Sequence, residues 1–178
     1  YRYDSHIRVG KTALMEASQN GHRDVVEALV GAGADVNQAN GDKYFFILAD
    51  KSAVHPLGWT ALMCASEKGH RDVVEALVGA GADVNKADRN RRTALMVASE
   101  KGHRDVVEAL VGAGADVNKA YKSGWTALMC ASRKGHRDVV ELLVGAGVDV
   151  NHADKYGKTA LMRASENGHR DVVELLVG

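Results

Sequence analysis

Apolar residues recur along the chain in short groups whose spacing is typical of helices. In the segment that begins at Thr93, the core-facing positions are Leu95, Ala98, Ser99, Val106, Val107, Leu110 and Val111. Steps of three and four residues indicate two amphipathic α-helices. A glycine follows each group, so we expect the first helix to end at Gly102 and the second at Gly114.

Polar residues at the predicted helix starts support this division. Thr93 precedes the first apolar group and is the expected N-cap, because a threonine hydroxyl can accept a hydrogen bond from a free helix amide. Asp105 followed by Glu108 resembles a capping pair for the second helix. After Gly114 the segment A-D-V-N and its variable successors have no helical period. They predict a projecting loop or hairpin, which we call a finger.

The same pattern occurs five times. The string T-A-L-M-x-A-S-x-x-G-H-R-D-V-V-E begins at Thr12, Thr60, Thr93, Thr126 and Thr159. The last three intervals are 33 residues and the first is 48, so residues 41–55 form an insertion. Neither helix of a unit can bury its apolar face alone. The sequence therefore predicts one domain over residues 1–178, an all-α solenoid of five stacked helix-turn-helix units with projecting fingers.

On these residues the chain resembles the ankyrin-repeat family over residues 7–178. The period, the G-H pair and the G-A-D-V-N string recur in place, although every copy reads T-A-L-M where the family has T-P-L-H. The resemblance implies a protein-binding groove formed by the finger tips and the concave face of the first helices.

The positions that differ between the copies predict the contact surface. They lie near each finger tip and at four, seven and eight residues after each repeated Thr, and these helix positions share one face. All nine aromatic residues also lie outside the repeated framework, as expected for binding hot spots. Packing between adjacent fingers is the alternative for both tryptophans. The predicted contact residues outside the insertion are Trp59, Arg89, Arg91, Arg92, Val97, Tyr121, Lys122, Trp125, Arg133, Tyr156, Lys158 and Arg163.

The insertion carries a strongly apolar run in a chain that otherwise repeats. Its candidate anchor residues are Tyr44, Phe45, Phe46, Ile47 and Leu48. Solenoids tolerate insertions on the binding face, so we interpret residues 41–55 as a binding loop. Self-packing that merely extends the first finger is the alternative.

The distribution of charge along the chain narrows the class of partner that we expect. The net charge is zero, but the repeated residues carry an excess of acid and the variable residues an equal excess of base. The cations on the predicted groove side are Arg89, Arg91, Arg92, Lys122, Arg133, Lys134, Lys155, Lys158 and Arg163. This distribution favours a protein partner with an acidic surface. Nucleic acid ranks behind it, because no nucleic-acid-binding module is present.

Catalytic and metal sites are not expected. His-Arg-Asp resembles a fragment of the kinase catalytic loop, but it recurs once per unit without the other kinase motifs. Cys64 and Cys130 stand two units apart, roughly 20 Å by helix-packing distances, which is too far for a disulfide. We expect free thiols lining the groove, no cofactor and no metal. An enzyme with a cysteine nucleophile is the remote alternative.

Two interpretations of origin remain open. Near-identical frameworks with diversity at contact positions are typical of an engineered binder selected against a protein target. A natural, recently duplicated array excerpted from a longer chain is the alternative, and the absence of polar capping units favours it, because solenoid ends normally need such units. Either flanking sequence is absent, or the exposed ends pair with another molecule in self-association. No apolar run approaches the roughly 18 residues of a membrane span. The presence of only two cysteines weakly favours a reducing compartment.

Overall fold

The computed structural model describes residues 12–41 and 57–178. The first helices of the five units are α1 (Ala13–Gln19), α3 (Ala61–Lys68), α5 (Ala94–Lys101), α7 (Ala127–Lys134) and α9 (Ala160–Glu166). The second helices are α2 (Arg23–Gly31), α4 (Arg71–Gly79), α6 (Arg104–Gly112), α8 (Arg137–Gly145) and α10 (Arg170–Val177). The described ranges contain no strand, only an isolated bridge between Ala87 and Thr93 in one finger. The predicted all-α solenoid of five helix-turn-helix units is confirmed.

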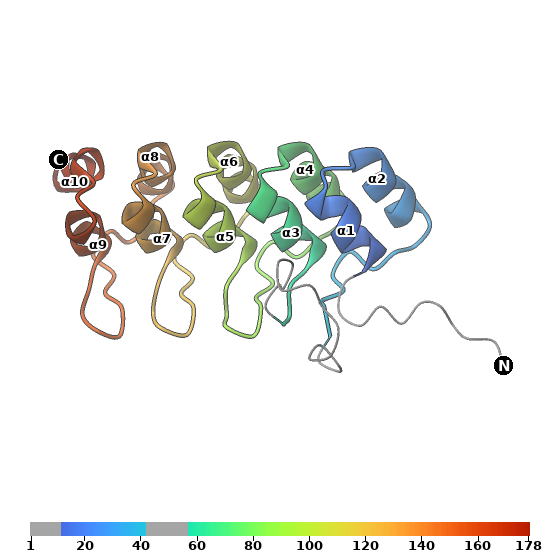
Figure 1. The fold of residues 1–178 in the computed structure, drawn as a ribbon, viewed down its shortest axis with the longest axis horizontal. Helices are drawn as coiled ribbons and strands as arrows, with labels where there is room; N and C mark the ends of the chain where they lie inside the picture. The colour runs from blue at the N-terminus through green and yellow to red at the C-terminus, as the bar shows by residue number, and fades with distance from the viewer. Residues whose placement is uncertain (1–11, 42–56) are drawn as a thin grey trace.

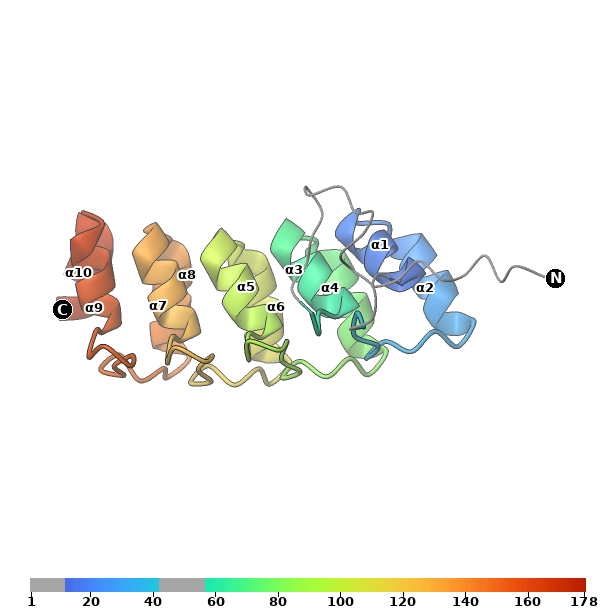
Figure 2. The same ribbon diagram turned by 60° about the horizontal axis from the view of Figure 1, so that its bottom comes forward.

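The helices form two layers from which the fingers project on one side (Figure 1). Each first helix packs on the first helix of the next unit, and each second helix on the next second helix. Figure 2 shows the fingers side by side along one edge. Because every unit repeats this arrangement, residues at equivalent positions form rows along the solenoid.

The first helices begin and end as the sequence predicts. The hydroxyl of Thr93 accepts a hydrogen bond from the backbone N–H of Met96 at 3.4 Å, and the other units repeat this cap. Gly102 follows α5 in the left-handed region with φ of 80°. After α6, the N–H of Ala115 donates to the carbonyl of Leu110 at 2.9 Å, which closes the helix end beside Gly114.

The predicted capping pair of the second helices is wrong. The helix α6 begins at Arg104, and His103 occupies the capping position without a side-chain hydrogen bond to the helix. The N–H of His103 donates to the carbonyl of Ala98 at 3.1 Å, so the turn between the helices is tight. Asp105 therefore already lies in the first turn, and Glu108 extends from the exposed outer face of the helix.

Polar side chains join each unit to the next. The Nε2 atom of His103 lies 2.9 Å from the carbonyl oxygen of Glu67 in the preceding unit. At the base of the fingers, the Oδ1 atom of Asn85 accepts a hydrogen bond from the N–H of Asp116 at 2.8 Å. Its Nδ2 atom donates to the carbonyl of Gly114 at 3.2 Å. These bonds fix the distance from one finger to the next.

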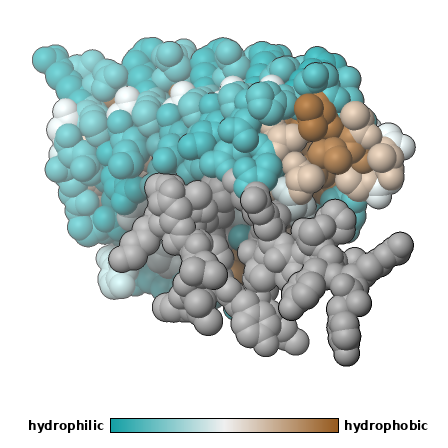
Figure 3. Space-filling model, turned by 45° about the vertical axis from the view of Figure 1, so that its right-hand side comes forward, coloured by the Kyte–Doolittle hydropathy of each residue, from teal (hydrophilic) through white to brown (hydrophobic). Residues whose placement is uncertain are grey.

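The end units expose residues whose counterparts are buried inside the solenoid. Val25 is 43% exposed, whereas Val73 at the same position of the next unit is 0% exposed. Met162 is 48% exposed, whereas Met129 is 1% exposed. Figure 3 shows an apolar patch at the N-terminal end. Of the ten described helices, none combines the length and apolarity needed to cross a membrane.

Candidate partner-binding surface

The finger tips before Thr93 and Thr159 are each built around an aspartate. The Oδ1 atom of Asp88 accepts hydrogen bonds from the N–H groups of Asn90 and Arg92, both at 2.8 Å. Asp154 holds the last finger in the same way, with its Oδ1 atom 2.8 Å from the N–H of Tyr156. An Asx turn of this kind orders a short loop without a β-ladder. The tip side chains are therefore carried on ordered backbone.

Backbone hydrogen bonds join successive tips. The N–H of Lys122 donates to the carbonyl of Asn90 at 3.1 Å, and the N–H of Lys155 donates to the carbonyl of Ser123 at 3.1 Å. The N–H of Arg89 bonds to the preceding finger in the same manner, at 3.0 Å. These three cations occupy equivalent positions and their side chains are exposed. We call Arg89, Lys122 and Lys155 the tip row.

Exposed side chains flank the tip row. Tyr156, next to Lys155, is 80% exposed. Arg91 is exposed and has a φ of 68°, the only positive φ among the non-glycine residues that the structure describes. Equivalent places in neighbouring fingers hold Gly124 and Gly157. Arg91 thus keeps a conformation that costs an L-residue free energy, at the middle of the predicted contact surface.

Below the tips, Trp125 packs against two arginines rather than facing solvent. The guanidinium carbon of Arg133 lies 4.8 Å from the centre of the Trp125 ring, and that of Arg163 lies 4.3 Å from it. The Tyr121 ring lies beside the same tryptophan, with the ring centres 6.1 Å apart. Trp125 is 9% exposed. Its role is to hold neighbouring units together by packing and cation–π attraction.

Glu100 joins two of the predicted contact arginines. One of its carboxylate oxygens lies 2.9 Å from Arg92, and the other lies 2.8 Å from Arg133 in the next unit. All three side chains are partly buried, and this geometry satisfies both carboxylate oxygens. The two guanidinium charges are therefore partly neutralised within the molecule.

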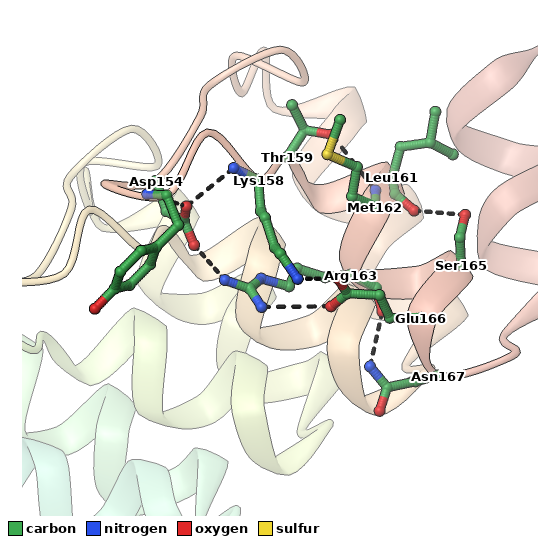
Figure 4. Close-up of polar contacts among 10 residues, drawn as sticks. Asp154, Lys158, Thr159, Leu161, Met162, Arg163, Ser165, Glu166 and Asn167 are labelled. Carbon is green, nitrogen blue, oxygen red and sulfur yellow. Dashed lines mark hydrogen bonds and ion pairs between the residues drawn. The ribbon is translucent and has the colours of Figure 1, made fainter.

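A second network holds the cations of the last unit (Figure 4). Arg163 reaches from α9 to the carboxylate of Asp154 in the finger and also lies 3.4 Å from Glu166. Lys158 pairs with the same Glu166. Burial raises the pKa of Asp154, but hydrogen bonds from the N–H of Lys158, from Arg163 and from the N–H of Tyr156 outweigh burial and hold its pKa below the ordinary value. The hydrogen bond from Lys158 likewise lowers the pKa of Glu166.

The free positive charge therefore lies at the tips rather than across the whole groove side. Arg92, Arg133, Lys158 and Arg163 are ion-paired, so the predicted basic groove is smaller than the sequence indicated. The groove-side cations with no described carboxylate within ion-pair distance are Arg91, Lys122, Lys134 and Lys155. Three of these four are tip residues.

Three predicted contact residues are buried, and their expected place on the exposed surface is wrong. Val97 is 1% exposed, Trp59 is 3% exposed and Trp125 is 9% exposed. Position four after each Thr varies among the units, but in the middle units it points into the packing between two-turn helices. The cysteines at this position, Cys64 and Cys130, are buried too, so neither lines an open groove.

The two thiols are poorly placed for nucleophilic chemistry. Burial, and after it the Glu100 carboxylate, raises the pKa of Cys130 to about 12. A thiol with such a pKa stays protonated near neutral pH, and the thiolate is the reactive form. Across the two described ranges, no three His, Cys, Asp or Glu side chains are grouped so that they could hold a metal ion.

The remaining predictions have different outcomes. Arg89, Arg91, Lys122 and Tyr156 are exposed as expected, and Tyr121 is half-buried beside Trp125. The candidate anchors Tyr44, Phe45, Phe46, Ile47 and Leu48 lie outside the described residues, so the binding loop stays a prediction.

Sequence reasoning missed the acids that hold the groove-side cations. Glu100 and Glu166 stand seven residues after the repeated Thr, at a position that is Arg133 in the fourth unit. The change from Glu100 to Arg133 at this position was a visible sign of an acid and a base in neighbouring units.

Comparison with known families places nearly the whole chain. A family model for three copies of the ankyrin repeat matches residues 42–121 and again residues 110–178. A model for a single ankyrin repeat matches residues 9–41. A comparison with curated proteins found no match.

Proposed function

The chain belongs to the ankyrin-repeat family, and we propose that it is a non-catalytic scaffold that binds a partner protein with an acidic surface through its finger tips. Ankyrin repeats generally mediate binding between proteins. The observation that carries the proposal is the set of exposed cations Arg91, Lys122 and Lys155, which have no carboxylate within ion-pair distance among the described residues, on tips that are held by backbone hydrogen bonds.

The ordered tips favour binding over an unspecific charged rim. A contact surface that is already in place loses little conformational entropy on association. Tyr156 adds a large exposed aromatic side chain beside the cations, and aromatic side chains are enriched at interfaces. The paired residues Arg92 and Arg133 support the tips from below, and their charge adds to the local positive potential.

The predicted loop at residues 41–55 remains part of this proposal. In the sequence it stands between the first and second units, where the other units have a finger, so we expect it on the partner-facing side. Its aromatic residues Tyr44, Phe45 and Phe46 would add apolar contacts to a surface whose described part is mainly charged. A partner that contacts both regions needs an apolar segment next to an acidic one.

A non-catalytic role agrees with the buried cysteines. An acyl-transfer or redox role would need an accessible thiolate, and Cys130 is buried with a raised pKa. The tip row carries lysine and arginine side chains without a nucleophile or a general base among them. Binding is the activity that this chemistry supports.

The proposal holds for either origin of the chain. An engineered binder is favoured by the near-identity of the frameworks. A natural duplicated array is favoured by the variation at buried positions, where Cys64, Val97 and Cys130 replace one another, since a selected library would vary exposed positions.

The experiment that tests the proposal compares the sets of proteins that three immobilised forms of the chain capture. Three forms of the 178-residue protein are immobilised: the parent, Lys122→Gln with Lys155→Gln, and Arg104→Gln with Arg137→Gln as a control. Both doubles remove two positive charges, but the control residues lie on the outer helices α6 and α8. Proteins held by the parent and the control, and lost from the tip variant, support the proposal. An identical captured set for all three forms contradicts it.

A further inference from the structure

The carboxylates of Asp88 and Asp154 are held by the same backbone frame. Each residue stands five positions before the repeated Thr of its unit. The N–H of each donates to the carbonyl of the residue four positions later, at 2.9 Å in both fingers. Each Oδ1 atom accepts two backbone hydrogen bonds at 2.8 to 3.0 Å, from Asn90 and Arg92 or from Tyr156 and Lys158. The second carboxylate oxygen, Oδ2, therefore takes an equivalent position in the two fingers.

The two Oδ2 atoms differ in what they meet. In the fifth unit, Arg163 donates a hydrogen bond to the Oδ2 atom of Asp154 and stacks on the ring of Trp125 (Figure 4). In the third unit, the Oδ2 atom of Asp88 is buried and has no hydrogen-bond partner among the described residues. The residue at the position of Arg163, four after the repeated Thr, is Val97. The third finger thus has the acceptor of this pair without the donor.

The arginines near this finger are engaged elsewhere. Arg92 and Arg133 each bind a different oxygen of Glu100, at 2.9 and 2.8 Å. Glu100 is therefore satisfied from two sides, whereas Asp88 forms no ion pair within the described ranges. A buried acceptor without a donor costs the folded protein about as much as a lost hydrogen bond. A donor that reaches this oxygen from outside removes that cost, so the site favours its binding.

Building on the proposed function, we propose that the Oδ2 atom of Asp88 receives the guanidinium of an arginine of the partner protein, in the place that Arg163 takes in the fifth unit. Asp88 is 5% exposed, so the guest is a narrow side chain inserted end-on. Interface side chains commonly change rotamer on binding, and such a change gives access here. A guanidinium suits the site better than an ammonium, because it is flat and more weakly hydrated.

The side chain of Arg163 shows the depth of such a site. It is 14% exposed, while the carboxylate that it binds is fully buried. A guest arginine in the equivalent place of the third unit would therefore keep its backbone at the surface of the groove. The partner that fits carries an acidic surface over the finger tips and one arginine beside it. The acidic surface provides attraction at a distance, and the arginine fixes the register of the complex.

A small probe tests the site without knowledge of the partner. N-acetyl-arginine methylamide is titrated at constant ionic strength into the isotope-labelled 178-residue protein, and amide NMR shifts are followed. The reporters are the N–H groups of Asn90 and Arg92, which bond to the carboxylate of Asp88. N-acetyl-citrulline methylamide is the matched control, because it has the same shape without the charge. We expect saturable shifts at both amides, with at least about fivefold tighter binding of the arginine probe.

Three variants place the probe. Asp88→Asn keeps an oxygen for the turn but should weaken the arginine probe at least about fivefold. Val97→Arg supplies a guanidinium from the chain itself and should prevent binding of the probe. Arg163→Val should create a second site, so that the amides of Tyr156 and Lys158 begin to respond to the probe. In the parent, where Arg163 already fills this place, they should not respond. Circular dichroism verifies that each variant is folded.

Thermal unfolding gives an independent measure that needs no probe. Asp154→Asn breaks an ion pair and should lower the Tm by about 2–4 °C. Asp88→Asn removes a buried charge without a donor, so we expect an unchanged or higher Tm. An equal fall for both variants would show that the Oδ2 atom of Asp88 already has a donor in solution, and the proposal would be rejected.

Other outcomes also overturn the proposal. If the amides of Asn90 and Arg92 show no saturable shift in the parent, or respond equally to the citrulline probe, the third finger does not bind a guanidinium. If folded Arg163→Val shows no response in the fifth unit, the frame that the two fingers share is not a binding site.

Failure of this inference is distinguishable from failure of the proposed function. If proteins captured by the parent are lost from the tip variant but no probe binds at Asp88, the proposed function stands and this inference is rejected. If the probe binds at Asp88 while the parent, the tip variant and the control capture identical sets, the guanidinium site stands and binding through the tips is rejected.

Discussion

Replacement of Arg91 by glycine is expected to stabilise the protein. Arg91 has a φ of 68°, and the left-handed conformation costs an L-residue about 1–2 kcal/mol. Glycine adopts this conformation without that cost but loses up to about 1 kcal/mol through the greater entropy of its unfolded chain. The expected gain for Arg91→Gly is therefore about 0.5–1 kcal/mol.

Neighbouring fingers supply the structural basis for this estimate. Gly124 takes the equivalent place with a φ of 84°, and Gly157 with a φ of 75°. A β-carbon added at Gly124 would lie 3.1 Å from the α-carbon of Asp154 in the next finger. Of these three equivalent positions, only that of Arg91 carries a side chain on a backbone conformation suited to glycine.

The assay is urea and thermal unfolding followed by circular dichroism at the helical band. A gain of this size in a chain of 178 residues raises the Tm by about 1–4 °C. The urea midpoint should rise with an unchanged m-value. Arg91→Ala is the matched control, because it removes the side chain but keeps the β-carbon, and we expect no gain from it.

Two results would refute the reasoning. If Arg91→Gly lowers the Tm, the side chain of Arg91 contributes more than its backbone conformation costs. If Arg91→Ala gains as much as Arg91→Gly, the gain comes from removing a cation among cations. Gly124→Ala provides the reverse test, with an expected loss of about 1–2 kcal/mol.

Three further predictions concern stability. Ser99 is 0% exposed, and its hydroxyl finds no partner within the described part of the chain; Ser99→Ala should raise stability by about 1 kcal/mol, and a lower Tm would show that the hydroxyl is satisfied. Gly102 has a φ of 80°, and an added β-carbon would lie 2.6 Å from Nδ1 of His136; Gly102→Ala should cost about 2 kcal/mol or more, whereas Gly112→Ala, with open space around it, should not lower the Tm. The pKa of Asp154 is lowered from its ordinary 3.8, so its contribution is present above about pH 4 and lost as the pH falls through the lowered value; Asp154→Asn should flatten the fall of Tm between about pH 4 and pH 2, and parallel curves for parent and variant would contradict the ion pair with Arg163.

The fold was predictable because its cause lies in a short repeated string. Helix starts at Thr93 and its equivalents follow from a local hydrogen bond, and the period of 33 residues implies stacking. The start of the second helix was not predictable from the pattern Asp105 and Glu108, because the tight turn before His103 sets it. The sequence was sufficient to predict a helix start wherever one hydrogen bond between a side chain and a nearby backbone amide sets that start.

The contact surface was less predictable because burial depends on both neighbouring units. Val97 varies among the copies yet is 1% exposed, since a two-turn helix with a helix on either side has little free circumference. The charge of Arg133 could be counted from the sequence, but its pairing with Glu100 required the register between α5 and α7. Variation between repeats therefore indicates freedom of sequence, and not exposure.

The asparagine bonds between the fingers have a mechanical consequence. Asn37 and Asn118 repeat the bond made by Asn85, with Oδ1 atoms 2.7 Å from the N–H groups of Asp83 and Asp149. On the opposite edge, an exposed ion pair at 3.3 Å between Arg71 and Glu108 bridges neighbouring second helices, and such pairs resist separation weakly.

The edge of the solenoid that carries the fingers should therefore resist stretching more than the edge formed by the second helices. When it bends, the outer helices separate or approach, while the fingers keep their distances. A ligand aligned with the tips would then meet the same distance between neighbouring tips however the solenoid curves.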